Sequence, residues 1–397
     1  MTDSKSDNRP TRALLRRREL LWLGIGALSG ASAVVLGRSP QPSGQATAQS
    51  PEARSFEVSG DRSLGARAAA KGILYGAAID RSILADDTAF TARFVQECRM
   101  LVPENSMKWR SLRPSLDTFD FNAADQVVDF ATQHNLEVRG HTLVWHQSLP
   151  GWFAEEVTRQ NAEQVLVNHV QTVARRYAGR IHSWDVVNEA IQPKEKQTDD
   201  FRNSPWFKLL GIDYVELAFR VAAEADPNAM LLYNDYSLDY DTDEDETKRN
   251  AVLRLLERLK SRGVPIHALG LQAHLDGQDS HQLNPVQMQR FLREVADLGL
   301  KVFVTELDVK DQTLPANVDQ RDRIVAAAYE DYLSAILAEP AVIAVLTWGL
   351  SDRYSWLSEF KPREDGMPVR PLPLDDELQP KLAWNAIARA FDQAPRR

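Results

Sequence analysis

Eight short apolar runs, each followed by a longer amphipathic segment, limit the folds that are open to this chain. The longer segments have the apolar spacing of helices, for example over 162–177, 214–225, 244–262, 285–298 and 321–337. The short runs indicate strands, and they cover 73–79, 98–102, 136–145, 181–188, 230–235, 268–274, 301–309 and 342–350. Eight strand–helix units in succession predict an α/β fold, namely a single (β/α)8 TIM barrel.

An open, doubly wound sheet is the alternative arrangement of alternating strands and helices. Such a sheet usually has a glycine-rich phosphate-binding turn after its first strand, whereas this chain has AAIDRS at 77–82. No GxGxxG or P-loop pattern follows any predicted strand. The closed barrel is therefore favoured. Within it, Asn161 followed by Gln164 has the spacing of a capping box, which predicts a helix start at Asn161.

Composition agrees with one barrel and excludes several classes of protein. The chain has 397 residues, of which 71–397 suffice for a barrel with insertions. The net charge of -9 argues against a nucleic-acid partner, because phosphate contacts require basic residues. Cys98 is the only cysteine, which excludes an internal disulfide framework and a cysteine-clustered metal site. We expect a monomer.

The first 48 residues indicate an export signal rather than part of the fold. RRELL at 17–21 resembles a twin-arginine motif, and an apolar stretch and a small-x-small ATA at 46–48 follow it. We therefore expect export to the periplasm or the extracellular space, with no stable membrane association after cleavage. An uncleaved anchor is the alternative, since 20–37 is about the minimum length that crosses a bilayer. Residues 49–70 are expected to be a linker or lead-in segment.

Polar and aromatic side chains follow seven of the eight predicted strands, at the carboxyl ends where barrel enzymes carry their active sites. They offer the mixed donors and acceptors that sugar hydroxyls require, and tryptophan faces for the sugar rings. These residues are Glu104, Asn105, Lys108, His141, Trp145, His146, Asn188, Glu189, Tyr236, Gln272, His274, Glu306, Asp308, Trp348 and Trp356. Glu189 and Glu306 follow strands on opposite sides of the barrel. A pair of this kind suits glycoside hydrolysis, in which one carboxyl group donates a proton and the other attacks or assists.

Seven segments resemble, in this order along the chain, those of glycoside hydrolase family 10 endo-β-1,4-xylanases. They are ENSMKW (104–109), GHTLVWHQSLPGW (140–152), WDVVNEA (184–190), NDY (234–236), LQAH (271–274), TELD (305–308) and WGLSDRYSW (348–356). The resemblance covers about residues 70–390. It implies an enzyme that cleaves β-1,4-xylosidic bonds in xylan and xylo-oligosaccharides by a retaining double displacement. It implies neither a cofactor nor a metal ion.

The same resemblance assigns roles to individual residues. Glu189 would be the general acid/base and Glu306 the nucleophile. Asn188 would bind the sugar 2-hydroxyl, and His274 would bond to the nucleophile with Asp308 behind it. Substrate-binding roles fall on Glu104, Asn105, Lys108, His141, Trp145, Gln272, Tyr236, Trp348 and Trp356.

Two features depart from the commonest form of the family pattern. Pro103 precedes the Glu-Asn pair, and the segment 360–374, rich in proline and charge, lengthens the last loop. Neither touches the two glutamates, so they bear on substrate preference rather than on reaction type.

Each assignment also has a purely structural alternative. Glu189 can be an ionic partner of Lys108, the histidines can be satisfied core residues, and the tryptophans can be core packing. His146 is open between a ligand contact and a supporting hydrogen bond. Trp184 and Cys98 are expected in the core, and Asp185 behind the site.

Three rival functions remain at this stage. His141, His146, His274 and Asp308 can be assembled into a metal-dependent hydrolase centre, although no HxH pair follows the first strand. A non-catalytic sugar-binding barrel would normally lack one of the two glutamates. A family 5-like cellulase or mannanase commonly has proline after its acid/base glutamate, and Ala190 stands there in this chain.

Overall fold

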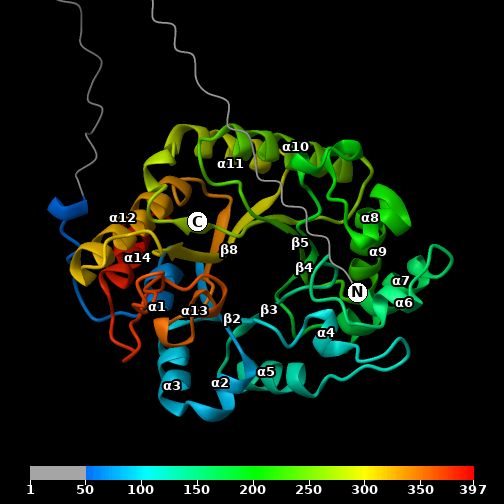
Figure 1. Cartoon of the computed structure of the whole chain (residues 1–397), viewed down its shortest axis with the longest axis horizontal. Coiled ribbons are helices and arrows are strands. Elements are labelled where there is room, and N and C mark those ends of the chain that lie inside the picture. The colour runs from blue at the N-terminus through cyan, green and yellow to red at the C-terminus, as the bar shows by residue number, and fades with distance from the viewer. Residues whose placement is uncertain (1–50) are drawn as a thin grey trace, which may run out of the picture. The chain divides into compact units, whose positions relative to one another are not determined.

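Eight parallel strands close into a barrel in the computed structural model, which describes residues 51–397 (Figure 1). Each strand pairs with its neighbours in chain order, and the pairing of the last with the first closes the ring. The strands are β1 (Leu74–Ile79), β2 (Met100–Pro103), β3 (Glu137–Gly140), β4 (Ser183–Asn188), β5 (Met230–Asp235), β6 (Ala268–Leu271), β8 (Lys301–Lys310) and β9 (Val342–Thr347). The predicted (β/α)8 barrel is confirmed.

Helices surround the barrel, because each parallel strand needs a crossover to reach the next. They are α1 (Leu64–Ala69), α2 (Arg81–Asp86), α3 (Thr88–Glu97), α4 (Trp109–Leu112), α5 (Asn122–Gln133), α6 (Phe153–Glu156), α7 (Ala162–Arg176), α8 (Pro205–Leu210), α9 (Tyr214–Ala225), α10 (Asp243–Ser261), α11 (Pro285–Asp297), α12 (Val318–Ile336), α13 (Leu357–Phe360) and α14 (Leu382–Gln393). Short 3-10 turns are η1 (Pro51–Ala53), η2 (Pro193–Glu195), η3 (Thr198–Asp200), η4 (Gly211–Asp213), η5 (Ser280–Gln282) and η6 (Asp352–Tyr354).

Three predicted strands end earlier in the structure than the apolar pattern indicates, and the one predicted over 342–350 ends at Thr347. The other two end where the site begins. The strand predicted over 136–145 ends at Gly140, and beyond it only an isolated bridge joins Val144 to Val187. The strand predicted over 268–274 ends at Leu271, and Ala273 has a left-handed φ of 59° that breaks the ladder. The chain resumes as β7 (His274–Asp276), which pairs with the end of β8. In both places the backbone leaves the sheet directly before residues that are predicted to form the site.

The predicted capping box at Asn161 is wrong, although α7 begins directly after this residue. The Asn161 backbone is already helical. Its side-chain oxygen accepts from the N–H of Thr158 at 2.7 Å, which precedes the helix, and not from an N–H of the first turn. Side-chain caps form elsewhere. Asn284 Oδ1 accepts from the N–H groups of Val286 and Gln287, at 3.1 and 3.3 Å, ahead of α11.

Side chains of the barrel strands alternate between two apolar clusters. One cluster fills the barrel and includes Met100, Leu232, Phe303 and Leu346. The other lies between the strands and the helices and includes Trp184, which is buried as expected. Inward-facing positions at the carboxyl ends of the strands therefore open into the mouth of the barrel, where the polar residues lie.

Of the expected lead-in segment, the structure describes residues 51–70, where α1 packs against α14. Arg67 of α1 is fully buried and pairs with Asp392. The expected export signal at 1–48 lies outside the described residues. Within 51–397, no helix has both the length and the apolar character that a membrane crossing requires.

Candidate active site

A cavity of about 620 Å³ lies at the carboxyl ends of the barrel strands. It is lined by every residue to which we assigned a catalytic, supporting or substrate-binding role, apart from Asp308. The lining includes Glu104, Asn105, Lys108, His141, Trp145, Asn188, Glu189, Tyr236, Gln272, His274, Glu306, Trp348 and Trp356. Residues up to 252 positions apart in the sequence thus line the same cavity.

Glu189 follows β4 in a conformation that its neighbours enforce. Its φ of 59° lies in the left-handed region, which costs a residue other than glycine about 1–3 kcal/mol. Two backbone hydrogen bonds hold it there. The Glu189 N–H donates to the Asn234 carbonyl at 2.9 Å, and Arg202 Nε donates to the Glu189 carbonyl at 2.7 Å. The turn aims the side chain into the cavity at a defined place.

Burial raises the pKa of the Glu189 carboxyl group above its ordinary value. The charges of Asp235 and Glu306 act in the same direction, whereas a hydrogen bond from Gln272 opposes them. Gln272 Nε2 donates to Glu189 Oε1 at 3.0 Å. His146 Nδ1 lies 3.8 Å from Glu189 Oε2, and burial lowers the pKa of His146 to about 3, so the ring is neutral. The pKa of Glu189 is therefore shifted upward, in the direction that a proton donor requires.

Glu306, on β8, is held by two donors on the two oxygens of its carboxylate. Asn234 Nδ2 donates to Oε1 at 2.7 Å, and His274 Nε2 lies 3.1 Å from Oε2. Burial alone would raise the pKa of Glu306, but the hydrogen bond from His274 and the nearby positive charges lower it to about 2. Glu306 is therefore ionised at neutral pH.

His274 lies between two carboxylates. Its Nδ1 is 3.0 Å from Asp308 Oδ1, and its Nε2 faces Glu306. Burial would lower the pKa of His274, but the two carboxylates raise it to about 10, so both ring nitrogens carry protons. Asp308 Oδ2 also accepts from Trp356 Nε1 at 2.7 Å. Asp308 thus orients both the histidine and a tryptophan of the cavity wall.

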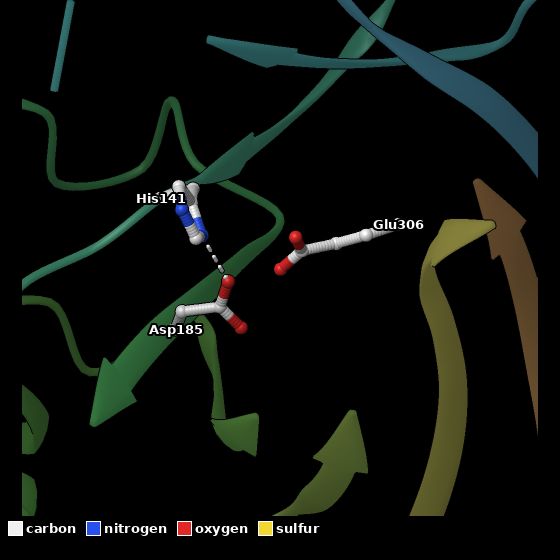
Figure 2. Close-up of side chains that lie close together, drawn as sticks. All are labelled: His141, Asp185 and Glu306. Atoms are coloured by element: carbon white, nitrogen blue, oxygen red, sulfur yellow. Dashed lines mark hydrogen bonds and ion pairs between the residues drawn. The ribbon is translucent and has the colours of Figure 1, made fainter. Parts of the chain in front are cut away.

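The side chains of His141 and Asp185 lie close to the carboxylate of Glu306, as Figure 2 shows. His141 Nδ1 lies 2.8 Å from Asp185 Oδ2, and Arg139 pairs with the other Asp185 oxygen inside the barrel. Arg139 and Asp185 are fully buried. Asp185 thus lies behind the site, as expected, and fixes the orientation of the His141 ring.

Within residues 51–397, His141, Asp185 and Glu306 form the only group of three potential metal ligands within mutual reach. Both oxygens of Asp185 and both oxygens of Glu306 already have protein partners. These donors are therefore satisfied without an ion. The set His141, His146, His274 and Asp308 is not brought together as a ligand group in this part of the chain.

The side of the cavity near β2 combines charge with aromatic faces. Lys108 Nζ donates to Asn105 Oδ1 at 3.1 Å and lies 5.4 Å from the centre of the Trp145 ring. No ion pair joins Lys108 to Glu189 among the described residues. Burial raises the pKa of Glu104 to about 7, although Lys108 opposes the change. The ring of Trp348 stands edge-on to His141 at 5.3 Å.

Several residues that organise the site carried no assigned role in the sequence analysis. Asn234 binds Glu306, Arg202 holds the Glu189 backbone, and Arg139 neutralises Asp185. Asn234 lies at the end of a predicted strand, and Arg139 is a charged residue within an apolar strand, so the sequence pattern marks both positions as candidates. Arg202 lies in a loop and had none. It also donates to the hydroxyl of Tyr236 at 2.8 Å.

The chain is similar to known proteins of one family. The model of glycosyl hydrolase family 10 matches residues 63–390. Endo-1,4-beta-xylanase A of Caldicellulosiruptor sp. (strain Rt8B.4) is 39% identical over 306 residues, which are 72% of this chain and 42% of that longer protein. Endo-1,4-beta-xylanase B of Thermotoga neapolitana is 34% identical over 299 residues, which are 75% of this chain and 82% of the relative.

A solved structure has the same fold. Xylanase 10B from Thermotoga petrophila RKU-1, in complex with xylobiose, superposes with a TM-score of 0.76 at 34% identity. The alignment covers 85% of this chain and 99% of that protein.

Proposed function

Because this chain belongs to glycosyl hydrolase family 10, we propose that it is an endo-acting β-1,4-xylanase that retains anomeric configuration. Xylan and xylo-oligosaccharides are its substrates. Relatives that are 34–39% identical carry the name endo-1,4-beta-xylanase, which supports this choice of polymer. A family 5-like cellulase or mannanase is no longer an alternative, since the family match is to family 10.

The observation that supports the chemistry is the opposite pKa shift of two glutamates in one cavity. Burial raises the pKa of Glu189, and the His274 hydrogen bond helps to lower the pKa of Glu306 to about 2. Two carboxyl groups whose pKa values are shifted apart at one site would serve as the acid and the nucleophile of a double displacement.

In the first step, Glu306 attacks the anomeric carbon while Glu189 gives its proton to the departing glycosidic oxygen. The bond from the anomeric carbon to this oxygen breaks, and an ester between the sugar and Glu306 forms. Asn234 and His274 hold the attacking carboxylate in line. Asn188, beside Glu189, would bind the 2-hydroxyl, a contact that strengthens in the transition state.

In the second step, water replaces Glu306 at the anomeric carbon. The charge on Glu306 is absent in the ester, so the pKa of Glu189 falls and its carboxylate takes a proton from the water. The ester bond breaks and Glu306 leaves as a carboxylate. Two inversions at one carbon return the β-configuration.

The experiment that tests the proposal is proton NMR of products during hydrolysis of β-1,4-xylan, with EDTA present. We expect β-anomeric xylo-oligosaccharides before mutarotation, at a rate that EDTA leaves unchanged. Early α-anomers would contradict Glu306 as the nucleophile, and loss of activity in EDTA would favour a metal-dependent hydrolase. Hydrolysis of glucan or mannan instead of xylan would contradict the substrate.

The proposal includes export, because residues 1–48 have the pattern of a twin-arginine signal. The mature enzyme would be a monomer in the periplasm or outside the cell. N-terminal sequencing of the exported protein should begin near Gln49, and light scattering should give the mass of one chain. A product that stays in the membrane with an intact N-terminus would favour the anchor.

A further inference from the structure

Lys248, in the second turn of α10, is a buried amine that has no part in the chemistry above. It is 2% exposed and does not line the active-site cavity. Its Nζ lies 2.7 Å from Asp235 Oδ1 and 3.6 Å from the centre of the Tyr236 ring. A buried ammonium loses its hydration, so it is retained only where partners compensate for that loss. The compensation for Lys248 comes from two residues at the carboxyl end of β5.

Asp235 connects Lys248 to the turn that holds Glu189. Asp235 is fully buried, and its Oδ2 accepts a hydrogen bond from the hydroxyl of Tyr233. The Tyr233 oxygen in turn accepts from the Ile191 N–H at 3.1 Å. Because Ile191 is the second residue after Glu189, this chain of contacts supports the turn on its carboxyl side.

Tyr236 forms a second connection to the same turn. The Lys248 ammonium lies over the face of its ring, and Asp235 Oδ1 accepts from the Tyr236 N–H at 2.9 Å. The Tyr236 hydroxyl accepts from Arg202 Nη2 at 2.8 Å, and Arg202 Nε donates to the Glu189 carbonyl at 2.7 Å. The two chains of contacts that support the turn therefore both begin at Lys248.

The charge of Lys248 also acts on the groups around the proton donor. Burial raises the pKa of Glu189, and the negative charge of Asp235 adds to this rise. Lys248 pairs with that carboxylate, so its positive charge opposes the effect of Asp235. Burial lowers the pKa of His146, the ring beside Glu189, to about 3, and the charges of Arg202 and Lys248 act in the same direction.

We propose that Lys248 is a positioning residue for the general acid, because its ammonium fixes Asp235 and Tyr236 and, through them, the turn that carries Glu189. The proposal rests on the proposed xylanase function. The left-handed φ of Glu189 is conformationally costly, so the turn persists only where several contacts hold it. Lys248 acts on the position of the proton donor without touching the sugar.

The test compares two substrates that differ in their need for a proton. Departure of a sugar from xylan requires the proton of Glu189, whereas a dinitrophenolate leaves without one. Lys248→Met keeps the length of the side chain and removes its charge. We expect its kcat/KM to fall by about 10- to 100-fold on xylan and by less than about threefold on 2,4-dinitrophenyl β-xylobioside, since only the proton donor is misplaced.

Two further variants separate the charge from the fold. Lys248→Arg keeps the charge, and a cavity of about 210 Å³ beside Lys248 gives room for the larger group, so its loss on xylan should be smaller than that of Lys248→Met. Tyr233→Phe breaks the contact with Ile191 and leaves Lys248 in place. It should show the same selective loss on xylan, and it provides the test if Lys248→Met does not fold.

Lys381→Met is the matched control. Lys381 Nζ lies 2.7 Å from Asp352 Oδ2, and both side chains are as deeply buried as those of the Lys248 pair. Neither residue lines the active-site cavity or contacts the Glu189 turn. Lys381→Met should lower the midpoint of urea denaturation, but the ratio of kcat/KM between the two substrates should stay at the value of the unaltered enzyme.

The outcomes distinguish this proposal from the proposed function. If the unaltered enzyme hydrolyses neither substrate, the xylanase assignment is wrong and the proposal fails with it. If the enzyme is active and the folded Lys248→Met variant loses equally on both substrates, or on neither, only the positioning role is wrong. A selective loss on xylan that is as large in Lys248→Arg or in Lys381→Met would contradict a role for the Lys248 charge at Glu189.

Discussion

Glu189 and Glu306 have the same functional group but pKa values shifted in opposite directions, and their neighbours explain the difference. Around Glu189, burial outweighs the hydrogen bonds from Gln272 and Trp145, so the pKa is raised. Around Glu306, Asn234 and the doubly protonated His274 outweigh burial, so the charge stays. Removing a hydrogen-bond donor to either glutamate should therefore shift the pH dependence of activity while the fold stays intact.

The leaving group decides how much the enzyme depends on Glu189. Glu189→Ala should lower kcat/KM on xylan by about 10²–10⁴-fold, because the proton donor is lost. The loss should be much smaller on a dinitrophenyl xylobioside, whose leaving group needs no proton. Glu306→Ala is the comparison, and it should abolish turnover of both substrates. Equal losses on both substrates in Glu189→Ala would contradict the acid/base role.

Gln272 sets part of the pKa of Glu189, and this gives a prediction with a definite sign. Its N–H stabilises the ionised form, so Gln272→Leu should raise the pKa of Glu189. Activity requires Glu189 protonated, so the alkaline limb of the kcat/KM profile should move to higher pH. The two limbs of the pH profile report the titration of Glu189 and Glu306 as a coupled pair.

Gln192→Leu is the control, because its amide donates to the Tyr236 hydroxyl rather than to Glu189. An alkaline limb that moves to lower pH in Gln272→Leu, or that moves as far in the control, would contradict this assignment.

At the scale of elements, the approach of neighbouring strands sets the geometry of the barrel mouth. β1 and β2 come together at Gly76, where a methyl group would lie 2.3 Å from the Met100 carbonyl oxygen. β2 leads into Glu104 and Asn105, so its position sets theirs. The Arg139–Asp185 pair links β3 and β4 inside the barrel in the same way.

Gly76→Ala should separate β1 from β2, because backbone cannot yield as a flexible side chain does. We expect a loss of about 1–3 kcal/mol in the free energy of unfolding, measured by urea denaturation. Gly151→Ala is the matched control, since its added methyl group would meet no atom within 4 Å. The hypothesis is wrong if both variants are equally stable.

At the scale of the whole described unit, α1 and α14 complete the helical layer over the junction of β1 and β9. Phe391 of α14 is fully buried and meets Tyr75 of β1 edge-on, with ring centroids 5.7 Å apart. The Arg397 N–H donates to the Lys71 carbonyl at 2.8 Å, which joins the end of the chain to the start of the barrel.

Phe391→Ala should therefore destabilise the entire barrel rather than the last helix alone. We expect a loss of about 3–5 kcal/mol, seen as one shifted transition by both circular dichroism and tryptophan fluorescence. Separate transitions by the two probes would indicate that α14 unfolds independently. Arg62→Ala, whose guanidinium is 3.4 Å from Asp392 at the surface, should change stability little.

Local sequence pattern predicts the barrel architecture and most of the side chains that line the cavity. Periodicity is a local property of the chain, so it indicates the eight strand–helix units and the polar residues that follow the strands. Tertiary structure alone decided where β3 and β6 end, that Asn161 does not cap α7, and that Arg202 and Asn234 hold the two glutamates.

The protonation states also required the structure. Glu189 and Glu306 are the same residue type in the sequence, and their pKa values separate only through burial and through donors that lie distant in the chain. The pairing of Lys248 with Asp235 likewise required the structure, because the two residues lie on different elements, α10 and β5. The local sequence pattern specifies the strands and helices, whereas pKa shifts and cavities arise from contacts between these elements.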